Sequence, residues 1–173
     1  MVCLNTNLPS VLLNTRRLKD NVKRKAIFLF CKGRKAHCTF LQETHSSVAD
    51  CSFWLNQWGD KIAMDQTNQQ VLLSALINVR WNVRTHKADE RGHWLTAVLN
   101  IEGCCIIIAN VYGYNNTSQN RLLLLEISEA INQYKNCYNT NLILLGGDLN
   151  IAPDDWLDRY PQNLQIIILI HYF

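Results

Sequence analysis

The chain has 173 residues and a formal net charge of +3 at pH 7, a length that suits one domain with a sizeable core. Its composition is 48% hydrophobic and 18% charged with only 3 prolines, which excludes a disordered chain of low apolar content and high net charge. Apolar runs such as 104–109 and 166–170 fall far short of the roughly 20 residues that cross a bilayer, and no signal peptide is recognisable. We therefore expect a soluble protein of the nucleus or cytoplasm with no membrane partner.

Cysteines and basic residues give two further expectations. The 7 cysteines include no Cys-x-x-Cys pair, so neither a zinc site nor a disulfide framework is indicated, and free thiols in a reducing compartment are expected. Nine of the 17 basic residues lie between Arg16 and Lys35, with Asp20 as the single acidic residue among them. This basic segment could neutralise nucleic-acid phosphates, and the alternative is a solvated helix face.

The first part of the chain predicts a strand, a helix and a second strand, over Ser10–Asn14, Lys19–Gly33 and Cys38–Gln42. In the helix, the basic side chains are expected to face solvent and an apolar stripe to be buried, formed by Val22, Ala26, Ile27, Leu29 and Phe30. The second strand leads directly into a polar cluster that begins at Glu43. Polar residues just past strand ends are where open α/β sheets usually build their sites.

The remaining elements are read from the same patterns. Helices are predicted over Ser46–Trp58 and Asn120–Tyr134, the second burying a face of Leu123, Leu124, Ile127, Ala130 and Ile131. Strands are predicted over Val71–Val83, Trp94–Ile101, Cys104–Tyr112 and Leu142–Leu145, with Glu102-Gly103 as a two-residue turn. The histidines at positions 37, 86 and 93 receive no role from the sequence.

Three polar clusters follow predicted strands: Gln42–His45, Asn110–Asn116 and Gly147–Asn150. Their carboxylate and amide oxygens suit a hard cation, and phosphodiester hydrolysis also needs a group that orients water and donors for the phosphate. Together with Leu13–Arg16, the clusters occur in the order and approximate spacing of the endonuclease/exonuclease/phosphatase superfamily. The stretch Leu13–His45 most resembles the endonuclease domains of LINE-type retrotransposons, which are associated with a reverse transcriptase.

This resemblance implies a fold and its extent. We expect an α/β protein, a four-layered α/β sandwich of the DNase I-like type, over residues 10–160. The family's later motifs, including a Ser-Asp-His element, are not found after Tyr160. The domain is therefore expected to be incomplete at the C-terminus, comprising the N-terminal two-thirds of the family domain, with residues 161–173 as an unrelated apolar tail.

The resemblance also implies roles for residues at the matching positions. Glu43 would bind Mg²⁺ (or Mn²⁺) with Asn14 as a helper of the metal or the phosphate, and no other small-molecule cofactor is expected. Asp148 would orient or activate the attacking water, and the remaining roles are contacts to the substrate, from Asn150 and Tyr112 at the scissile phosphate and from Asn115 and His45 nearby.

Five of these residues also have a purely structural interpretation. Glu43 could be an exposed strand-end residue, Asp148 and Asn150 an Asx-stabilised turn, Tyr112 a core side chain and His45 a strand-end residue. Asp158-Arg159 resembles a pair found in retrotransposon enzymes, where a local ion pair is as plausible as a functional contact.

The expected parent activity is metal-dependent nicking of DNA by a monomer, with this chain weakly active or inactive because the later motifs are missing. Two alternatives stay open. One is a noncatalytic remnant that at most binds nucleic acid through the basic segment. The other is a related enzyme with a different substrate, such as abasic DNA in the manner of exonuclease III-like nucleases, or an inositol phosphate.

Overall fold

The computed structural model describes residues 9–65, 70–71, 73–77, 81–150 and 166–171. The helices are α1 (Asn21–Gly33), α2 (Cys51–Trp58) and α3 (Thr117–Tyr138), and a 3-10 turn, η1, covers Val48–Asp50. The strands are β1 (Ser10–Asn14), β2 (Cys38–Gln42), β3 (Ser46–Ser47), β4 (Lys61–Met64), β5 (Gln70–Val71), β6 (Ser74–Ile77), β7 (Asn82–Ala88), β8 (Trp94–Ile101), β9 (Cys104–Tyr112), β10 (Leu142–Asp148) and β11 (Ile166–His171).

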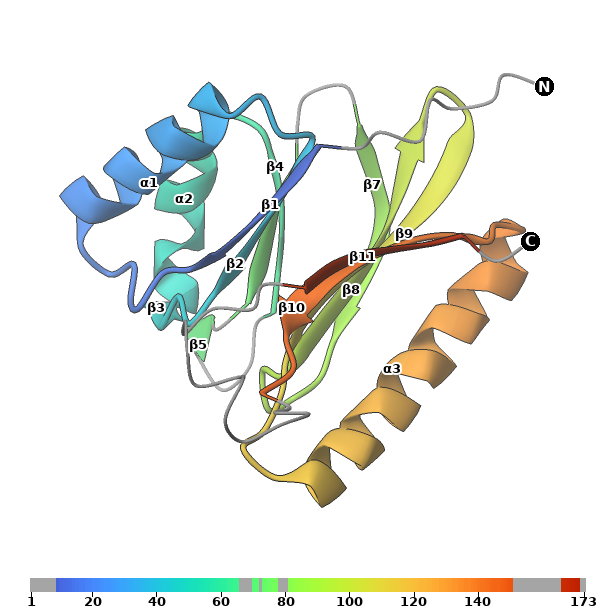
Figure 1. Cartoon of the computed structure of the whole chain (residues 1–173). Helices are drawn as coiled ribbons and strands as arrows, with labels where there is room; N and C mark the ends of the chain where they lie inside the picture. The colour runs from blue at the N-terminus through green and yellow to red at the C-terminus, as the bar shows by residue number, and fades with distance from the viewer. Residues whose placement is uncertain (1–8, 66–69, 72, 78–80, 151–165, 172–173) are drawn as a thin grey trace.

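Two sheets pack against each other with helices on their outer faces. The first has the strand order β1-β2-β6-β4 and the second β11-β10-β9-β8-β7, while β3 and β5 form a separate two-stranded ribbon. Helices α1 and α2 lie outside the first sheet and α3 outside the second (Figure 1). This arrangement confirms the predicted four-layered α/β sandwich.

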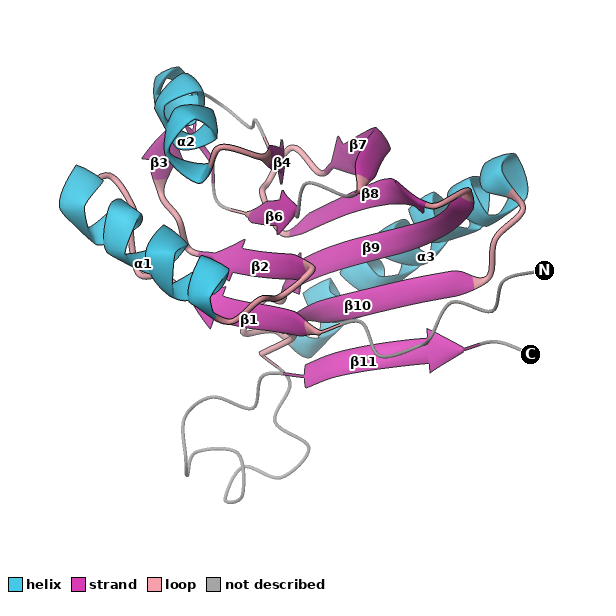
Figure 2. Ribbon diagram, turned by 90° about the horizontal axis from the view of Figure 1, so that it is seen from above, coloured by secondary structure: helices cyan, strands magenta, loops and turns pink. Residues whose placement is uncertain are grey.

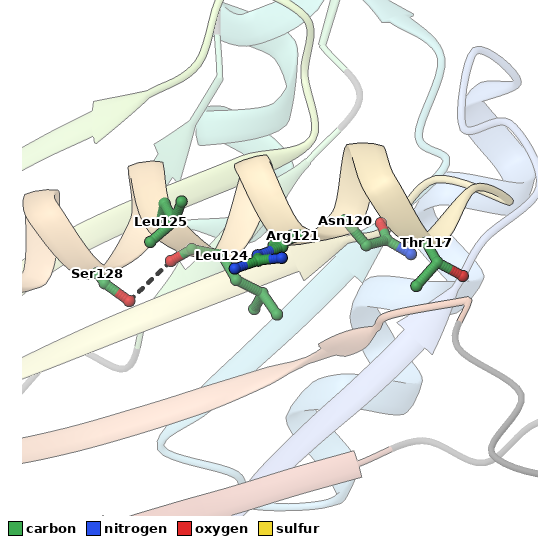
Figure 3. A pocket seen from close by; sticks show the side chains of 6 residues that line it. All are labelled: Thr117, Asn120, Arg121, Leu124, Leu125 and Ser128. Carbon is green, nitrogen blue, oxygen red and sulfur yellow. Dashed lines mark hydrogen bonds between the residues drawn. The ribbon is translucent and has the colours of Figure 1, made fainter.

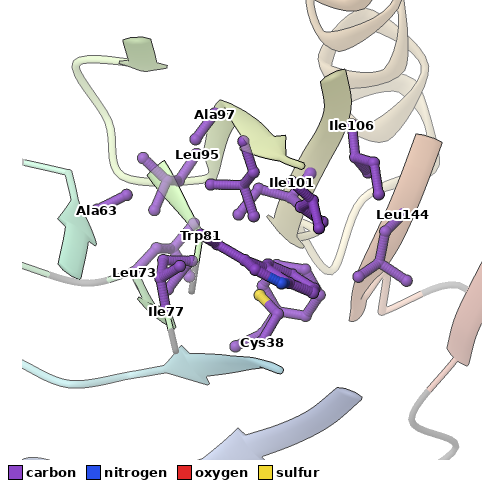
Figure 4. Packing of buried hydrophobic residues seen from close by; sticks show 14 of the residues in the cluster. Cys38, Ala63, Leu73, Ile77, Trp81, Leu95, Ala97, Ile101, Ile106 and Leu144 are labelled. Atoms are coloured by element: carbon purple, nitrogen blue, oxygen red, sulfur yellow. The ribbon is translucent and has the colours of Figure 1, made fainter. Parts of the chain in front are cut away.

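The principal core lies between the two sheets (Figure 4). Strand β8 is apolar at nearly every position because both of its faces are buried. Leu95, Ala97 and Leu99 face the first sheet, while Trp94 and Val98 face the layer of α3. A strand buried on both faces cannot show the alternation of a half-exposed strand.

Helix α1 forms where the sequence predicts it, but it buries a different face. The buried residues are Arg24, Phe28 and Cys31, whereas Val22 is 77% exposed and Leu29 60% exposed. The prediction that these apolar residues form the buried stripe, and that all basic side chains face solvent, is therefore wrong. Arg24 can be buried because its guanidinium donates to the Leu18 carbonyl at 3.0 Å and to Gln57 Oε1 at 2.6 Å, so that these N–H groups keep hydrogen-bond partners.

Most other predicted elements are confirmed, with shifted bounds. The turn Glu102-Gly103 joins β8 and β9 with φ values of 51° and 91°, as a two-residue hairpin turn with two left-handed residues requires. Within Ser46–Trp58 the helix starts only at Cys51, after β3 and η1. The segment 71–83 is not one strand, because β5, β6 and the start of β7 divide its described residues.

The described cysteines, at positions 31, 38, 51, 104, 105 and 137, are all free thiols. Residues 166–171, which fall within the predicted apolar tail, pair antiparallel with β10 as β11 (Figure 2). Among the described residues, none of the helices is long and apolar enough to span a membrane.

Candidate functional site

The site is assembled at the carboxyl ends of four strands. Strands β1 and β2 run parallel with Asn14 opposite Gln42, and β9 and β10 run parallel with Tyr112 opposite Asp148. Because parallel strands end at the same edge of a sheet, the residues that follow them gather there. The two edges, one from each sheet, meet at Glu43, the first residue after β2.

Glu43 is held from both sheets. Its Oε1 accepts a hydrogen bond from Asn14 Nδ2 at 2.8 Å and another from the Tyr112 hydroxyl at 2.6 Å. The Tyr112 hydrogen bond is the main cause that lowers the pKa of Glu43, with further lowering by Asn14 and by the nearby charges of His45 and Arg16, against the opposing effect of burial. Glu43 is therefore an ionised carboxylate at neutral pH, positioned by two donors.

Tyr112 links this carboxylate to the third polar cluster. Burial, the hydrogen bond to Glu43 and the charges of Glu43 and Asp148 raise the pKa of Tyr112 to about 12, while the Asn150 amide opposes this rise. Tyr112 thus keeps its proton at neutral pH and acts as a hydrogen-bond donor. The interpretation of Tyr112 as a core residue holds only for its ring, which packs against the principal core.

Asp148 and Asn150 form a tight turn at the end of β10. The Asn150 backbone N–H donates to Asp148 Oδ1 at 2.9 Å, and Asn150 Nδ2 donates to the Gly113 carbonyl at 2.7 Å. The structure therefore contains the Asx turn that the sequence allowed. Because the turn is bonded to the loop after β9, it places both side chains beside Tyr112.

Glycines allow these segments to approach so closely. A Cβ on Gly113 would lie 2.0 Å from the Leu149 carbonyl oxygen, and one on Gly147 would lie 2.0 Å from the Val111 carbonyl oxygen. Both contacts are with backbone, which cannot move aside without separating β9 from β10.

Asn120, in the first turn of α3, holds the loop that precedes it. This side chain is buried, accepts from the Tyr114 N–H at 2.6 Å and donates to the carbonyls of Tyr114 and Leu149 at 2.7 and 3.0 Å. Sequence reasoning treated Asn120 only as the start of a helix. Asn115 in the same loop is exposed, and no hydrogen bond joins it to the site within the described part of the chain.

A pocket of about 200 Å³ opens beside Glu43, lined also by His45, Leu73, Gly92, His93 and Tyr112. His45, which the resemblance implied as a substrate contact, therefore lines the pocket beside Glu43. His93 also lies there although the sequence assigned it no role. Its Nδ1 is 2.6 Å from the Tyr112 carbonyl oxygen and its ring stacks on Tyr114 with a centroid distance of 3.6 Å.

Asp89 explains the position of His93. The buried carboxylate of Asp89 accepts from the backbone N–H groups of His93 at 2.6 Å and Trp94 at 3.1 Å. In the sequence, Asp89 appears only as an acidic residue three positions before Gly92. That pattern is common in tight turns and gives no sign that Asp89 positions His93. Asp158-Arg159, by contrast, lies outside the described residues.

A second hollow, of about 290 Å³, lies along one side of α3 (Figure 3). Its lining comes from a single helix and includes Leu124, Leu125 and Arg121. It is separate from Glu43 and brings together no pair of carboxylates, so we do not assign it to the site.

The residues at Glu43 fit a magnesium ion. Magnesium is usually bound through one or two carboxylates, with waters and substrate phosphates completing an oxygen shell, and the Glu43 carboxylate supplies one such ligand. Asn14 turns its amide nitrogen to Glu43, while its amide oxygen accepts from the Arg16 N–H at 3.2 Å, so this amide would have to turn over to bind the ion. No group of three or more His, Cys, Asp or Glu side chains suited to a metal occurs among the described residues.

No protein-family model and no curated protein matches the sequence, but solved structures share the fold. Truncated TDP2 from Caenorhabditis elegans matches over 83% of this chain and 61% of that chain, with a TM-score of 0.59 and 16% identity. TDP2 from D. rerio complexed with single strand DNA product matches over 83% and 60%, with a TM-score of 0.55 and 12% identity. A mannosyl-6-phosphatase from Bacteroides thetaiotaomicron matches over 88% and 68%, with a TM-score of 0.61 and 8% identity.

These similarities define the structural class: the chain has the DNase I-like α/β sandwich fold of these solved structures. The chain spans less than two thirds of the length of either TDP2 structure.

Proposed function

We propose that this chain carries a metal-dependent phosphodiesterase site whose parent activity is the nicking of DNA, of the type found in the endonuclease domains of LINE-type retrotransposons, and that the chain itself nicks DNA weakly at most. The observation that supports this most directly is the arrangement around Glu43. A carboxylate with a lowered pKa is held by Asn14 and Tyr112 beside the Asp148–Asn150 turn. The TDP2 structure with a DNA product has the same fold, which supports a nucleic-acid substrate.

In the proposed reaction a water molecule attacks the phosphorus of a phosphodiester, and the bond from phosphorus to the leaving oxygen breaks. The water loses a proton and the leaving oxygen gains one, which gives a phosphate monoester and a hydroxyl. Asp148 orients or deprotonates the water, while Tyr112 and Asn150 donate hydrogen bonds to the phosphate oxygens as negative charge develops. Mg²⁺ or Mn²⁺ bound by Glu43 and Asn14 would polarise the phosphate and stabilise the leaving oxygen.

The pocket beside Glu43 would receive the substrate. His45 lines it and would contact the nucleotide, and the exposed Asn115 would contact the substrate from the loop after β9. The Tyr112 hydroxyl donates to Glu43 at 2.6 Å, so its role toward phosphate requires that this hydrogen be shared or redirected when the substrate binds.

Nicking of supercoiled plasmid tests the proposal, with purified protein in Mg²⁺, in Mn²⁺ and in EDTA. We expect weak, metal-dependent nicking that Glu43→Gln reduces to the level seen in EDTA, since this change removes the charge of the proposed metal ligand. The exposed Glu129 on α3 provides a matched control, because Glu129→Gln removes the same charge far from the pocket.

The outcomes separate the competing functions. Nicking that persists in EDTA, or that Glu43→Gln leaves unchanged, would contradict the proposal. Folded protein that binds DNA without nicking it would favour the noncatalytic alternative, and cleavage confined to abasic DNA would favour an exonuclease III-like enzyme.

A further inference from the structure

The loop between β1 and α1 has an unusual backbone. Arg16 and Arg17 both adopt the left-handed region, with φ values of 44° and 75°, which normally favours glycine. The loop is fastened to the segment after β2, because the Arg17 N–H donates to the Glu43 carbonyl at 2.8 Å and the Leu18 N–H to the Thr44 carbonyl at 2.6 Å. Two arginines thus occupy strained positions directly beside Glu43.

These two arginines add positive charge at the edge of the site. Both are exposed, and among the described residues neither forms an ion pair. Lys23 adds a third charge, since its Nζ donates to the Arg16 carbonyl at 2.9 Å. The acidic residue in this part of the chain, Asp20, caps α1 by accepting from the Lys23 N–H at 2.6 Å.

The other half of the basic segment lies elsewhere. Helix α1 has 13 residues, which at about 1.5 Å per residue separates its ends by about 20 Å, and it leads away from the strand ends (Figure 1). At its far end the Lys32 ammonium lies 5.2 Å from the Trp58 ring centroid and the Arg34 guanidinium 4.7 Å from that of Phe30. Lys35, just beyond, has a φ of 54°.

We propose that Arg16, Arg17 and Lys23 form a backbone-binding rim, over which the phosphates of a DNA duplex run as the strand enters the site at Glu43. The three positive charges complement successive phosphates. The rim gives a role to arginine side chains at two positions where glycine would relieve strain. The choice of DNA as the occupant rests on the proposed function, whereas the placement of the charges does not.

The structure offers a closely matched pair of variants. Arg17→Gly and Lys35→Gly each remove one positive charge and each replace a residue of positive φ with glycine. They differ in position, one at the site and the other at the far end of α1. Since glycine relieves the strain in both, the melting temperature should be retained or raised, so a loss of binding cannot be attributed to misfolding.

The test is fluorescence anisotropy of a labelled DNA duplex titrated with full-length protein in EDTA, at several salt concentrations. Arg17→Gly should weaken binding severalfold and lower the slope of log K against log salt by about 0.9, the contribution of one phosphate contact. Lys35→Gly should leave both the affinity and the slope unchanged. Arg16→Gly, the second position in the rim, should behave like Arg17→Gly.

Two results would overturn the rim: equal effects of Arg17→Gly and Lys35→Gly, or no measurable duplex binding by the wild-type protein at about 50 mM salt, where phosphate contacts are strong. Plasmid nicking separates this proposal from the proposed function. Loss of binding in Arg17→Gly without any nicking by the wild type supports the rim and contradicts the nuclease. Nicking and binding unaffected by Arg17→Gly contradict the rim and leave the nuclease intact.

Discussion

Tyr112 combines two properties in one hydroxyl group, donation to Glu43 and a pKa raised to about 12. Removing that hydroxyl with Tyr112→Phe takes away a hydrogen bond to a charged group, whose contribution is roughly 1.5–3 kcal/mol. We expect a nicking rate roughly 10- to 100-fold lower, measured on supercoiled plasmid. Because the Tyr112 hydrogen bond is the main cause that lowers the pKa of Glu43, the pKa of Glu43 should rise in this variant.

Tyr112→Phe should also change how the free energy of unfolding depends on pH. The pKa of Tyr112 is higher in the folded protein than the ordinary value of about 10, so its stabilising contribution is complete below about pH 10 and is lost as the pH rises toward 12. The stability difference between wild type and Tyr112→Phe should therefore shrink over that range, measured by urea unfolding. Tyr138→Phe, at the end of α3, is the control, and a constant difference for Tyr112→Phe would refute the argument.

Residues that end strands could be found from sequence, because a polar residue after an apolar run is visible in the chain itself. Asn14, Glu43, Tyr112 and Asp148 are of this kind. The structure brings them together at one edge of the two sheets. His93 could not be found in this way, because its position depends on hydrogen bonds to Asp89 and to the Tyr112 carbonyl. Such contacts follow from the tertiary structure and leave no periodic pattern.

Helix α3 contributes to the site through one buried amide. Asn120 satisfies backbone groups of Tyr114 and Leu149, in the two loops that flank the site. Asn120→Ala leaves these groups without partners, and we expect the free energy of unfolding to fall by about 1–3 kcal/mol. Nicking should also weaken, because the loops lose their common anchor.

Asn132→Ala provides the control on the same helix, at an exposed position. Urea unfolding of both variants at neutral pH would check the prediction, and equal stabilities of the two variants would contradict it.

Elements were predictable where periodicity and turn chemistry agree. The hairpin of β8 and β9 was confirmed because Glu102-Gly103 suits a tight turn between two apolar runs. In α1 the position of the helix was correct and its buried face was not. An average hydrophobic pattern gives no weight to a buried arginine, yet Arg24 finds acceptors at Leu18 and Gln57. Arg24 lies on the buried face with Phe28 and Cys31, and Val22 lies on the exposed face.

A buried polar contact joins the two sheets directly beneath the site. Gln42 Nε2 from β2 donates to Asn110 Oδ1 at 3.2 Å and to the Val111 carbonyl at 2.6 Å. Asn110 Nδ2 from β9 donates to the carbonyls of Leu41 at 3.0 Å and Ser74 at 3.2 Å, both in the first sheet. Each donor therefore crosses from one sheet to the other. Glu43 directly follows Gln42 in the chain, and Tyr112 lies two residues after Asn110.

A double-mutant cycle of Gln42→Ala and Asn110→Ala tests whether this contact aligns the sheets. Each single change leaves buried polar groups unpaired and should destabilise the fold by about 1–3 kcal/mol. The double variant should lose less than the sum of the two, by about 0.5–3 kcal/mol, because the second change removes a partner already lost. Nicking should fall in both single variants, since Glu43 and Tyr112 lie in different sheets. Additive losses of stability with unchanged nicking would show that apolar packing alone sets the alignment.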